Sequence, residues 1–186
     1  MKNCILLLLF IFAPAATSFA APPTGQIHIG WAMTSITPKQ PVALAGQFHK
    51  RISERVESPC TATVLAIETR KGEQSLEQAI MVSCDLVLIA DHLQPRLRKM
   101  LAGRLPGFDP KKLFLNATHT HTGPVTRAIG WYTVDDNGVL KPPAYVDFML
   151  KKIAAAIESA WKNPAPGGAS WGLGHAVVGS NRRMVY

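Results

Sequence analysis

The alternation of apolar and polar positions predicts three strands in the first half of the chain. Residues 26–36 alternate with the period of a strand that buries one face. Residues 60–69 form a second candidate strand, and the turn signal Arg70-Lys71-Gly72-Glu73 follows it. Residues 79–89 are almost wholly apolar, so we expect a strand that is buried on both faces. Residues 38–59 connect the first two strands, and connections of this length are often functional in compact domains.

Two later segments have apolar side chains at helical spacing. In the first, Asp91 is a suitable N-cap residue, and leucines recur every four positions until about Gly103. The second helix is expected after Pro142-Pro143, and residues 164–168 end it. Its apolar stripe consists of Tyr145, Met149, Ile153, Ile157 and Trp161.

Shorter strands are expected at residues 112–116 and 169–178, which completes the order β-β-β-α-β-α-β. Strands that are mixed with helices, some of them buried on both faces, are typical of α/β proteins. We therefore predict an α/β fold, a layered mixed β-sheet flanked by helices, within a single unit over residues 21–186.

Residues 1–20 have the features of a secretory signal peptide. Lys2 gives a positive start, an apolar run extends from Cys4 to Ala13, and Ser18-Phe19-Ala20 offers small residues for the peptidase. The alternative is an N-terminal membrane anchor, but the run is too short to span a bilayer comfortably. We expect an exported protein, either periplasmic or extracellular.

Charge and composition exclude some functional classes. The net charge is +8, yet the basic residues are scattered in pairs rather than gathered into the patch that nucleic-acid binding requires. The surface is therefore expected to attract anionic partners modestly, including anionic lipid surfaces, and not to bind nucleic acid. A composition of 47% apolar and 17% charged residues argues against disorder.

Removal of the signal peptide leaves two cysteines, Cys60 and Cys84, on candidate neighbouring strands. In an exported protein they could form a disulfide, or they could be two buried free thiols. The sequence leaves both alternatives open, because it does not give the distance that a disulfide requires.

The strongest candidate for chemistry is the pair His119 and His121, which directly follows a predicted strand. In an extended segment these side chains project to the same face, so they suit a zinc site, or one zinc ligand and its partner. The alternative is a polar pair on the surface. Gly123-Pro124 turns the chain away and leaves the tip of the strand open. Hydroxyl groups that could fix the imidazole tautomers come from Thr118, Thr120 and Thr122.

Other catalytic patterns are missing from the sequence. It contains no His-x-His-x-Asp-His, no His-Glu-x-x-His and no Gly-x-Ser-x-Gly. Gly167-Gly168 lacks the lysine of a phosphate-binding loop, and Cys84 in an apolar strand is expected to be inert.

Three further residues are weighed as neighbours of the site. Asp85 follows a buried strand and could orient a histidine or cap a turn. Trp131 and Tyr132 could form an apolar lip for an acyl chain, or they could pack in the core.

The segment Thr118-His119-Thr120-His121-Thr122-Gly123-Pro124 resembles the Thr-His-Thr-His-Ser-Gly-Pro motif of the neutral/alkaline non-lysosomal ceramidases. The resemblance extends over about residues 26–186, because three weaker blocks follow the family's order. These blocks are Ser35-Ile36-Thr37-Pro38 with Leu44-Ala45-Gly46, then Val82-Ser83-Cys84-Asp85-Leu86, then Asn181-Arg182.

The resemblance implies a zinc-dependent amide hydrolase that converts ceramide, or N-acylsphingosine, to sphingosine and a fatty acid. It implies that His119 is a Zn²⁺ ligand, that His121 is catalytic beside the zinc-bound water and the substrate, and that Arg182 contacts the substrate. It also implies that the chain is the N-terminal portion of a larger catalytic domain, whose substrate is a lipid-like amide.

Two departures from the family keep other functions open. The family's remaining zinc ligands are a His, a Glu and a Tyr. They lie well downstream of the Asn-Arg block, at positions that would come after residue 186. Glu57-Ser58-Pro59 replaces the family's His-Asp-Pro element. One alternative is therefore a non-catalytic fragment that binds lipid or a partner, and another is a related hydrolase of a different amide or ester.

Overall fold

The computed structural model describes residues 25–128, 130 and 132–178. The predicted signal peptide, Trp131 and the Asn181-Arg182 block lie outside these described residues.

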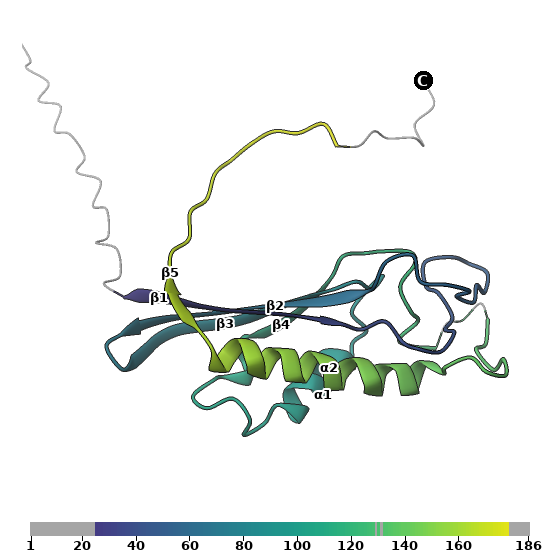
Figure 1. Ribbon diagram of the computed structural model, residues 1–186, viewed down its shortest axis with the longest axis horizontal. Coiled ribbons are helices and arrows are strands. Elements are labelled where there is room, and N and C mark those ends of the chain that lie inside the picture. Colours follow the sequence, from purple (N-terminus) through teal and green to yellow (C-terminus); the bar gives the residue numbers. More distant parts are fainter. Residues whose placement is uncertain (1–24, 129, 131, 179–186) are drawn as a thin grey trace, which may run out of the picture.

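The described residues form one mixed sheet with two α-helices, which confirms the predicted α/β fold (Figure 1). The sheet order is β4-β3-β2-β1-β5; β3 and β4 are parallel, and the other neighbours are antiparallel. The parallel pair is connected through α1, as a crossover connection requires. The elements are β1 (Gln26–Ser35), β2 (Thr61–Lys71), β3 (Gln74–Cys84), α1 (Leu93–Met100), the 3-10 turn η1 (Pro110–Lys112), β4 (Leu113–Ala117), α2 (Pro142–Lys162) and β5 (Ala165–Gly167).

Helix α2 lies against one face of the sheet and carries most of the core. Four residues of its predicted stripe, Tyr145, Met149, Ile153 and Ile157, are at most 1% exposed. Trp161 is the exception: it is partly buried, and its indole N–H donates to the carbonyl of Pro106 at 3.1 Å. The strands contribute alternate residues to the same core, among them Val64 of β2 and Val82 of β3.

The prediction that residues 79–89 form a strand buried on both faces is wrong in two respects. Strand β3 ends at Cys84, because the chain turns away after Asp85, whose carboxylate bonds to Thr61 at the start of β2. It is also buried on one face only: Ile80 and Val82 are fully buried, whereas Met81 between them is 37% exposed. Both helices lie on the same side of the sheet, so alternate residues of β3 point away from the core (Figure 1).

The prediction of a final strand over residues 169–178 is also wrong. Residues 165–167 form β5 instead, which pairs with β1 in the register Ile27↔Gly167 and Ile29↔Ala165. This antiparallel direction carries the chain past the start of β1, so residues 168–178 find no strand to pair with and have no regular structure.

Two smaller observations concern helix α1, which differs from its prediction, and the cysteines, for which the sequence left two alternatives open. Helix α1 begins after His92 rather than after Asp91, and no side chain caps it. Cys60 and Cys84 are free thiols rather than a disulfide. Burial raises the pKa of Cys84 to about 12 and also raises that of Cys60, so both thiols remain protonated at neutral pH. Among the described residues, no helix combines the length and the apolar character that a membrane span requires.

The contact between Gly30 of β1 and helix α2 leads to a stability prediction. A Cβ atom at this position would lie 1.9 Å from the carbonyl oxygen of Ala160 and 2.8 Å from its carbonyl carbon. Gly30→Ala should therefore push α2 off the sheet and lower the free energy of unfolding by about 1–3 kcal/mol, measured by urea denaturation. Gly130→Ala is the control, because nothing lies within 4 Å of its Cβ position. Equal stability of the two variants would show that α2 does not pack this closely.

Candidate functional site

The His-rich segment begins where β4 ends, at the sheet edge where β1 and β3 end as well. The amide of Thr118 continues the pairing with β3 by donating to the carbonyl of Cys84 at 3.0 Å. The next residue, His119, leaves the strand with a φ of +63°, the only positive φ of a described residue other than glycine. A left-handed histidine is an uncommon conformation that costs roughly 1–3 kcal/mol, and such strain is concentrated at functional sites.

The backbone fixes the tautomer of His119. Its Nδ1 atom lies 2.6 Å from the carbonyl oxygen of Val87. Because a carbonyl oxygen can only accept, Nδ1 carries the hydrogen of the neutral ring and Nε2 carries a free lone pair. This arrangement, in which one ring nitrogen donates to a backbone carbonyl, is the usual one for a metal-binding histidine.

The lone pair of His119 faces the second histidine. The two Nε2 atoms of His119 and His121 are 3.3 Å apart, and the rings meet edge to face with their centroids 4.9 Å apart. Neither side chain is buried in the core. The pair therefore projects to one side of the segment, and Nε2 of His121 can donate a hydrogen bond to Nε2 of His119 when no other group binds there.

Two residues of the long connection 38–59, Gly46 and Arg51, contact the His-rich segment at His121. Gly46 has a φ of +93°, and a Cβ atom there would lie 2.5–2.7 Å from atoms of the His121 side chain. The guanidinium of Arg51 donates to the carbonyl of Ala45 at 3.0 Å and also to the carbonyl of His121. Further along, Lys50 forms an ion pair with Asp136 at 2.8 Å, and this bond lowers the pKa of the Asp136 carboxyl.

Asp85 connects three parts of the site. Its Oδ2 atom accepts from the amide and the hydroxyl of Thr61 at 2.8 and 2.9 Å, and its Oδ1 atom accepts from the hydroxyl of Thr118 at 3.2 Å. The carboxylate thus accepts a hydrogen bond from Thr118, the residue before His119, rather than from an imidazole.

Sequence reasoning assigned the wrong groups to support the imidazoles. The hydroxyls of Thr120 and Thr122 bond to each other at 3.0 Å, and the hydroxyl of Thr118 donates to Asp85. The carbonyl of Val87 fixes the tautomer instead, and a carbonyl leaves no signal in a sequence. Gly46 and Arg51 were also missed as contacts of His121, since only the folded connection brings them there.

The remaining predicted residues are placed only in part. Trp131 and Arg182 lie outside the described residues. The neighbouring Tyr132 donates its hydroxyl to the carbonyl of Leu44 at 3.4 Å, and burial raises its pKa. It thereby attaches the loop after the His-rich segment to the connection 38–59.

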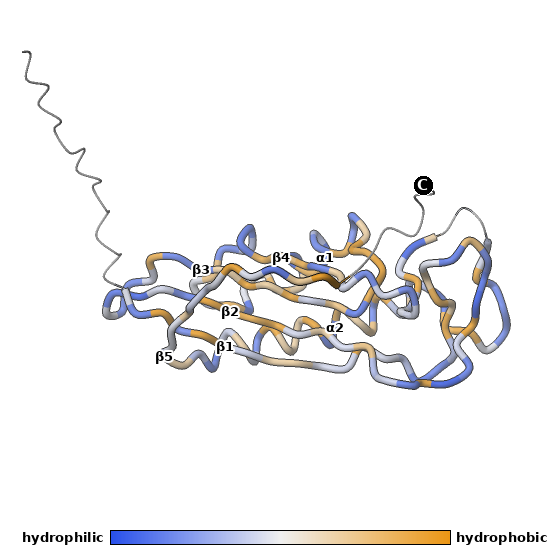
Figure 2. Tube along the Cα trace, turned by 90° about the horizontal axis from the view of Figure 1, so that it is seen from above, coloured by the Kyte–Doolittle hydropathy of each residue, from blue (hydrophilic) through white to orange (hydrophobic). Residues whose placement is uncertain are grey.

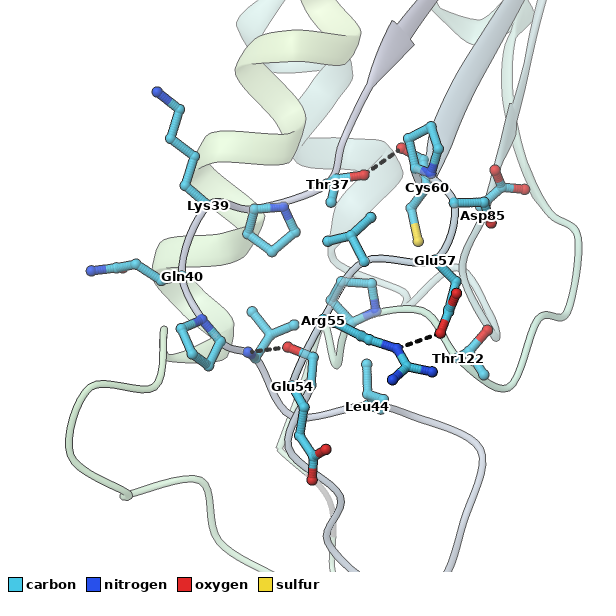
Figure 3. A pocket seen from close by; sticks show the side chains of 18 of the residues that line it. Thr37, Lys39, Gln40, Leu44, Glu54, Arg55, Glu57, Cys60, Asp85 and Thr122 are labelled. Carbon is cyan, nitrogen blue, oxygen red and sulfur yellow. Dashed lines mark hydrogen bonds and ion pairs between the residues drawn. The ribbon is translucent and has the colours of Figure 1, made fainter.

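A pocket of about 670 Å³ lies on the threonine side of the His-rich segment (Figure 3). The connection 38–59 forms most of its wall, and Thr120, Thr122 and Asp85 close it. Its charged lining includes the ion pair of Arg55 with Glu57. The segment therefore has two different sides, an exposed imidazole pair and a pocket lined by hydroxyls and charges.

The imidazole pair can supply two nitrogen ligands to a metal ion. Within the described part of the chain, no group of three or more His, Cys, Asp or Glu side chains could hold a metal. Protein zinc sites use at least three protein ligands, so a complete site needs donors other than those described.

Comparison with solved structures identifies the fold. The crystal structure of neutral ceramidase from Pseudomonas aeruginosa superposes with a TM-score of 0.64 and 22% identity, covering 77% of this chain and 22% of that chain. A ceramidase complexed with C2 gives a TM-score of 0.61 and 19% identity, with the same coverage of both chains. No family model matches the sequence, and no curated protein matches it. The expected resemblance to neutral ceramidase is thus confirmed for the fold, and the chain spans about a fifth of the length of these structures.

The close approach of Gly46 to His121 yields a prediction with a matched control. Gly46→Ala should strain the backbone and also displace the His121 ring, because its Cβ would lie 2.5 Å from Cγ of that ring. Gly103→Ala strains a similar φ of +74° but has open space around its Cβ position. We expect both variants to lose about 1 kcal/mol of stability. Only Gly46→Ala should shift the His121 imidazole resonances in NMR spectra; unchanged resonances would contradict the contact.

Proposed function

We propose that this chain belongs to the neutral ceramidase family and carries one side of a zinc-dependent amide hydrolase site, as the N-terminal portion of a larger catalytic domain. The observation that supports this most directly is the imidazole pair of His119 and His121. It lies at one edge of a ceramidase-like sheet, with the Nε2 lone pair of His119 directed outward by Val87. The substrate in this proposal is ceramide or a similar lipid-like amide.

The geometry of the pair fits a zinc ion. Two nitrogen ligands at about 2.0–2.1 Å from a tetrahedral zinc are separated by roughly 3.3–3.4 Å. The observed separation of the two Nε2 atoms is 3.3 Å. The same distance also suits a hydrogen bond, so His121 can be either a second ligand or a partner of the group bound at His119.

We assign the ligand role to His119 and a catalytic role to His121. Bound zinc would supply a water of lowered pKa and polarise the scissile carbonyl. Arg51 donates a hydrogen bond to the carbonyl of His121, and the His121 ring lies against Gly46. In this position His121 would hydrogen-bond the reacting groups beside His119. In this proposal Arg182 contacts the substrate, and Trp131 contributes an apolar contact to an acyl chain.

The proposal extends to the location and partners of the protein. Residues 1–20 would direct export to the periplasm or the cell exterior, where a lipid-like amide is met at a membrane surface. The net charge of +8 would favour contact with anionic lipids.

Two specific observations support alternative functions. Glu57-Ser58-Pro59, the segment that departs from the family pattern, lines the pocket beside the His-rich segment, which favours a hydrolase of another amide or ester. Among the described residues, no third metal-binding side chain joins the imidazole pair, which favours a non-catalytic unit that binds lipid or a partner.

The roles of the two histidines can be separated in the full-length gene product. His119→Ala should remove stoichiometric zinc, measured by metal analysis after dialysis, and should abolish ceramide hydrolysis. His121→Ala should retain zinc and lower kcat by roughly 10²–10⁴-fold if it acts as a catalytic partner. Loss of zinc in His121→Ala would instead make it a second ligand.

The matched control is His92→Ala, because His92 is an exposed histidine outside the His-rich segment. It should leave zinc content and activity unchanged. Unaltered zinc and activity in His119→Ala would overturn the proposed function. Zinc without any hydrolysis of ceramide, but with cleavage of another amide or ester, would favour the related hydrolase.

A further inference from the structure

The sheet has one face that the described helices do not cover, which we call the open sheet face. Trp31 and Met33 of β1 are 62% and 57% exposed on this face, and Phe114 of β4 is 48% exposed. The strand register places Trp31 opposite Leu65, Leu65 opposite Met81, and Met81 opposite Phe114. Because paired residues share a face, these side chains form one apolar row across four strands.

The row is part of a larger apolar surface. Towards the start of β1, Ile29 lies opposite Ile67, and both are only partly buried on the same face. Towards the His-rich segment the face becomes more polar, with Thr63, Ser83 and Asn116 opposite one another in turn. With strands about 4.8 Å apart, the apolar part is wide enough to be an interaction surface rather than scattered exposed residues.

Residues 168–178 also expose apolar side chains, which could pack against the apolar open sheet face. Four of their apolar side chains are almost fully exposed: Trp171 at 93%, Leu173 at 88%, Val177 at 101% and Val178 at 93%. Trp171, Leu173, His175 and Val177 occupy alternate positions, so an extended chain places these three apolar side chains and one histidine on the same side. The opposite side carries Ser170, Gly172, Gly174 and Ala176 before it reaches Val178. This segment is thus a short amphipathic stretch that pairs with no described strand.

The segment begins beside one end of the open sheet face. Strand β5 lies beside the start of β1, and the chain leaves it at Gly167-Gly168, where glycine permits a sharp change of direction. In Figures 1 and 2 residues 168–178 pass over the sheet on the side opposite α2, and Figure 1 shows that they stand clear of it. Ten extended residues reach about 33 Å, which is enough to run along the whole of β1.

We propose that residues 169–178 pack onto the open sheet face along β1 and β2. The apolar side chains of Trp171, Leu173 and Val177 cover Trp31 and Met33 of β1 and Leu65 of β2. The backbone edges of the segment remain open to water or to further pairing, so the packing leaves no buried amide unsatisfied. This inference concerns the fold and holds whether or not the chain binds zinc.

Two methionines on the open sheet face provide a test in the full chain. Met33 and Met81 are accessible when the segment is absent from the face, at 57% and 37% exposure. A covered methionine is oxidised more slowly by peroxide, because the reaction follows exposure. We therefore expect Trp171→Ala/Leu173→Ala to accelerate the oxidation of Met33 by at least about threefold, followed by mass spectrometry.

The control changes the opposite side of the same segment. Ser170→Ala/Ala176→Ser should leave the oxidation of Met33 unchanged, and Met149, which is 1% exposed in the core, should react slowly in every variant. Equal oxidation rates of Met33 in the unmodified chain and in the Trp171→Ala/Leu173→Ala variant would overturn the proposal.

A cross-linking experiment provides an independent test of the contact. A benzophenone amino acid at position 173 should cross-link within one chain to peptides of β1 or β2, whereas the same group at position 172 should not. Cross-links to another copy of the chain, to the helix side of the sheet, or to nothing would each contradict the proposal.

Discussion

The arrangement of the candidate site depends on the Asp85 carboxylate. It follows β3 directly, and its two oxygens reach Thr61 at the start of β2 and Thr118 at the end of β4. These bonds end an apolar run that would otherwise continue as a strand, and they join the edge of the sheet where the His-rich segment begins. Since the carboxylate accepts from three donors, its position is fixed relative to both neighbouring strands. The turn after Asp85 also brings Val87 to His119, so the tautomer of that ring follows from the same turn.

Contacts around His119 explain why its backbone keeps a strained conformation. A histidine with a φ of +63° persists only when surrounding contacts determine it. Those contacts come from the carbonyl of Val87 on one side and, through His121, from Gly46 and Arg51 on the other. The result is an imidazole whose Nε2 lone pair faces the Nε2 atom of His121 at 3.3 Å, with both rings outside the core of the sheet. A surface polar pair would not require a left-handed residue, a glycine pressed against one ring and an arginine bound to the segment's backbone.

The sequence predicted the elements with strong periodicity and missed those that tertiary contacts determine. The stripe from Tyr145 to Ile157 predicted α2 because an apolar period near 3.6 residues, sustained over several turns, is specific to an amphipathic helix. The same reasoning failed for β3, since an apolar run cannot show which of its faces a neighbour covers. For the site, the spacing of His119 and His121 predicted their shared side, but not their support. Val87 acts through its backbone, and Gly46 and Arg51 arrive from a connection without periodicity, so no local pattern could reveal them.

The open sheet face and the two-imidazole site are connected by the direction of the chain. Strands β1, β3 and β4 all end at the edge that carries His119, whereas β5 lies beside the start of β1. A segment that leaves β5 and covers β1 lengthwise therefore finishes at the edge with the histidines. The proposed covering of the apolar face would then bring residue 178, the last described residue, to the end of the sheet that carries the candidate site.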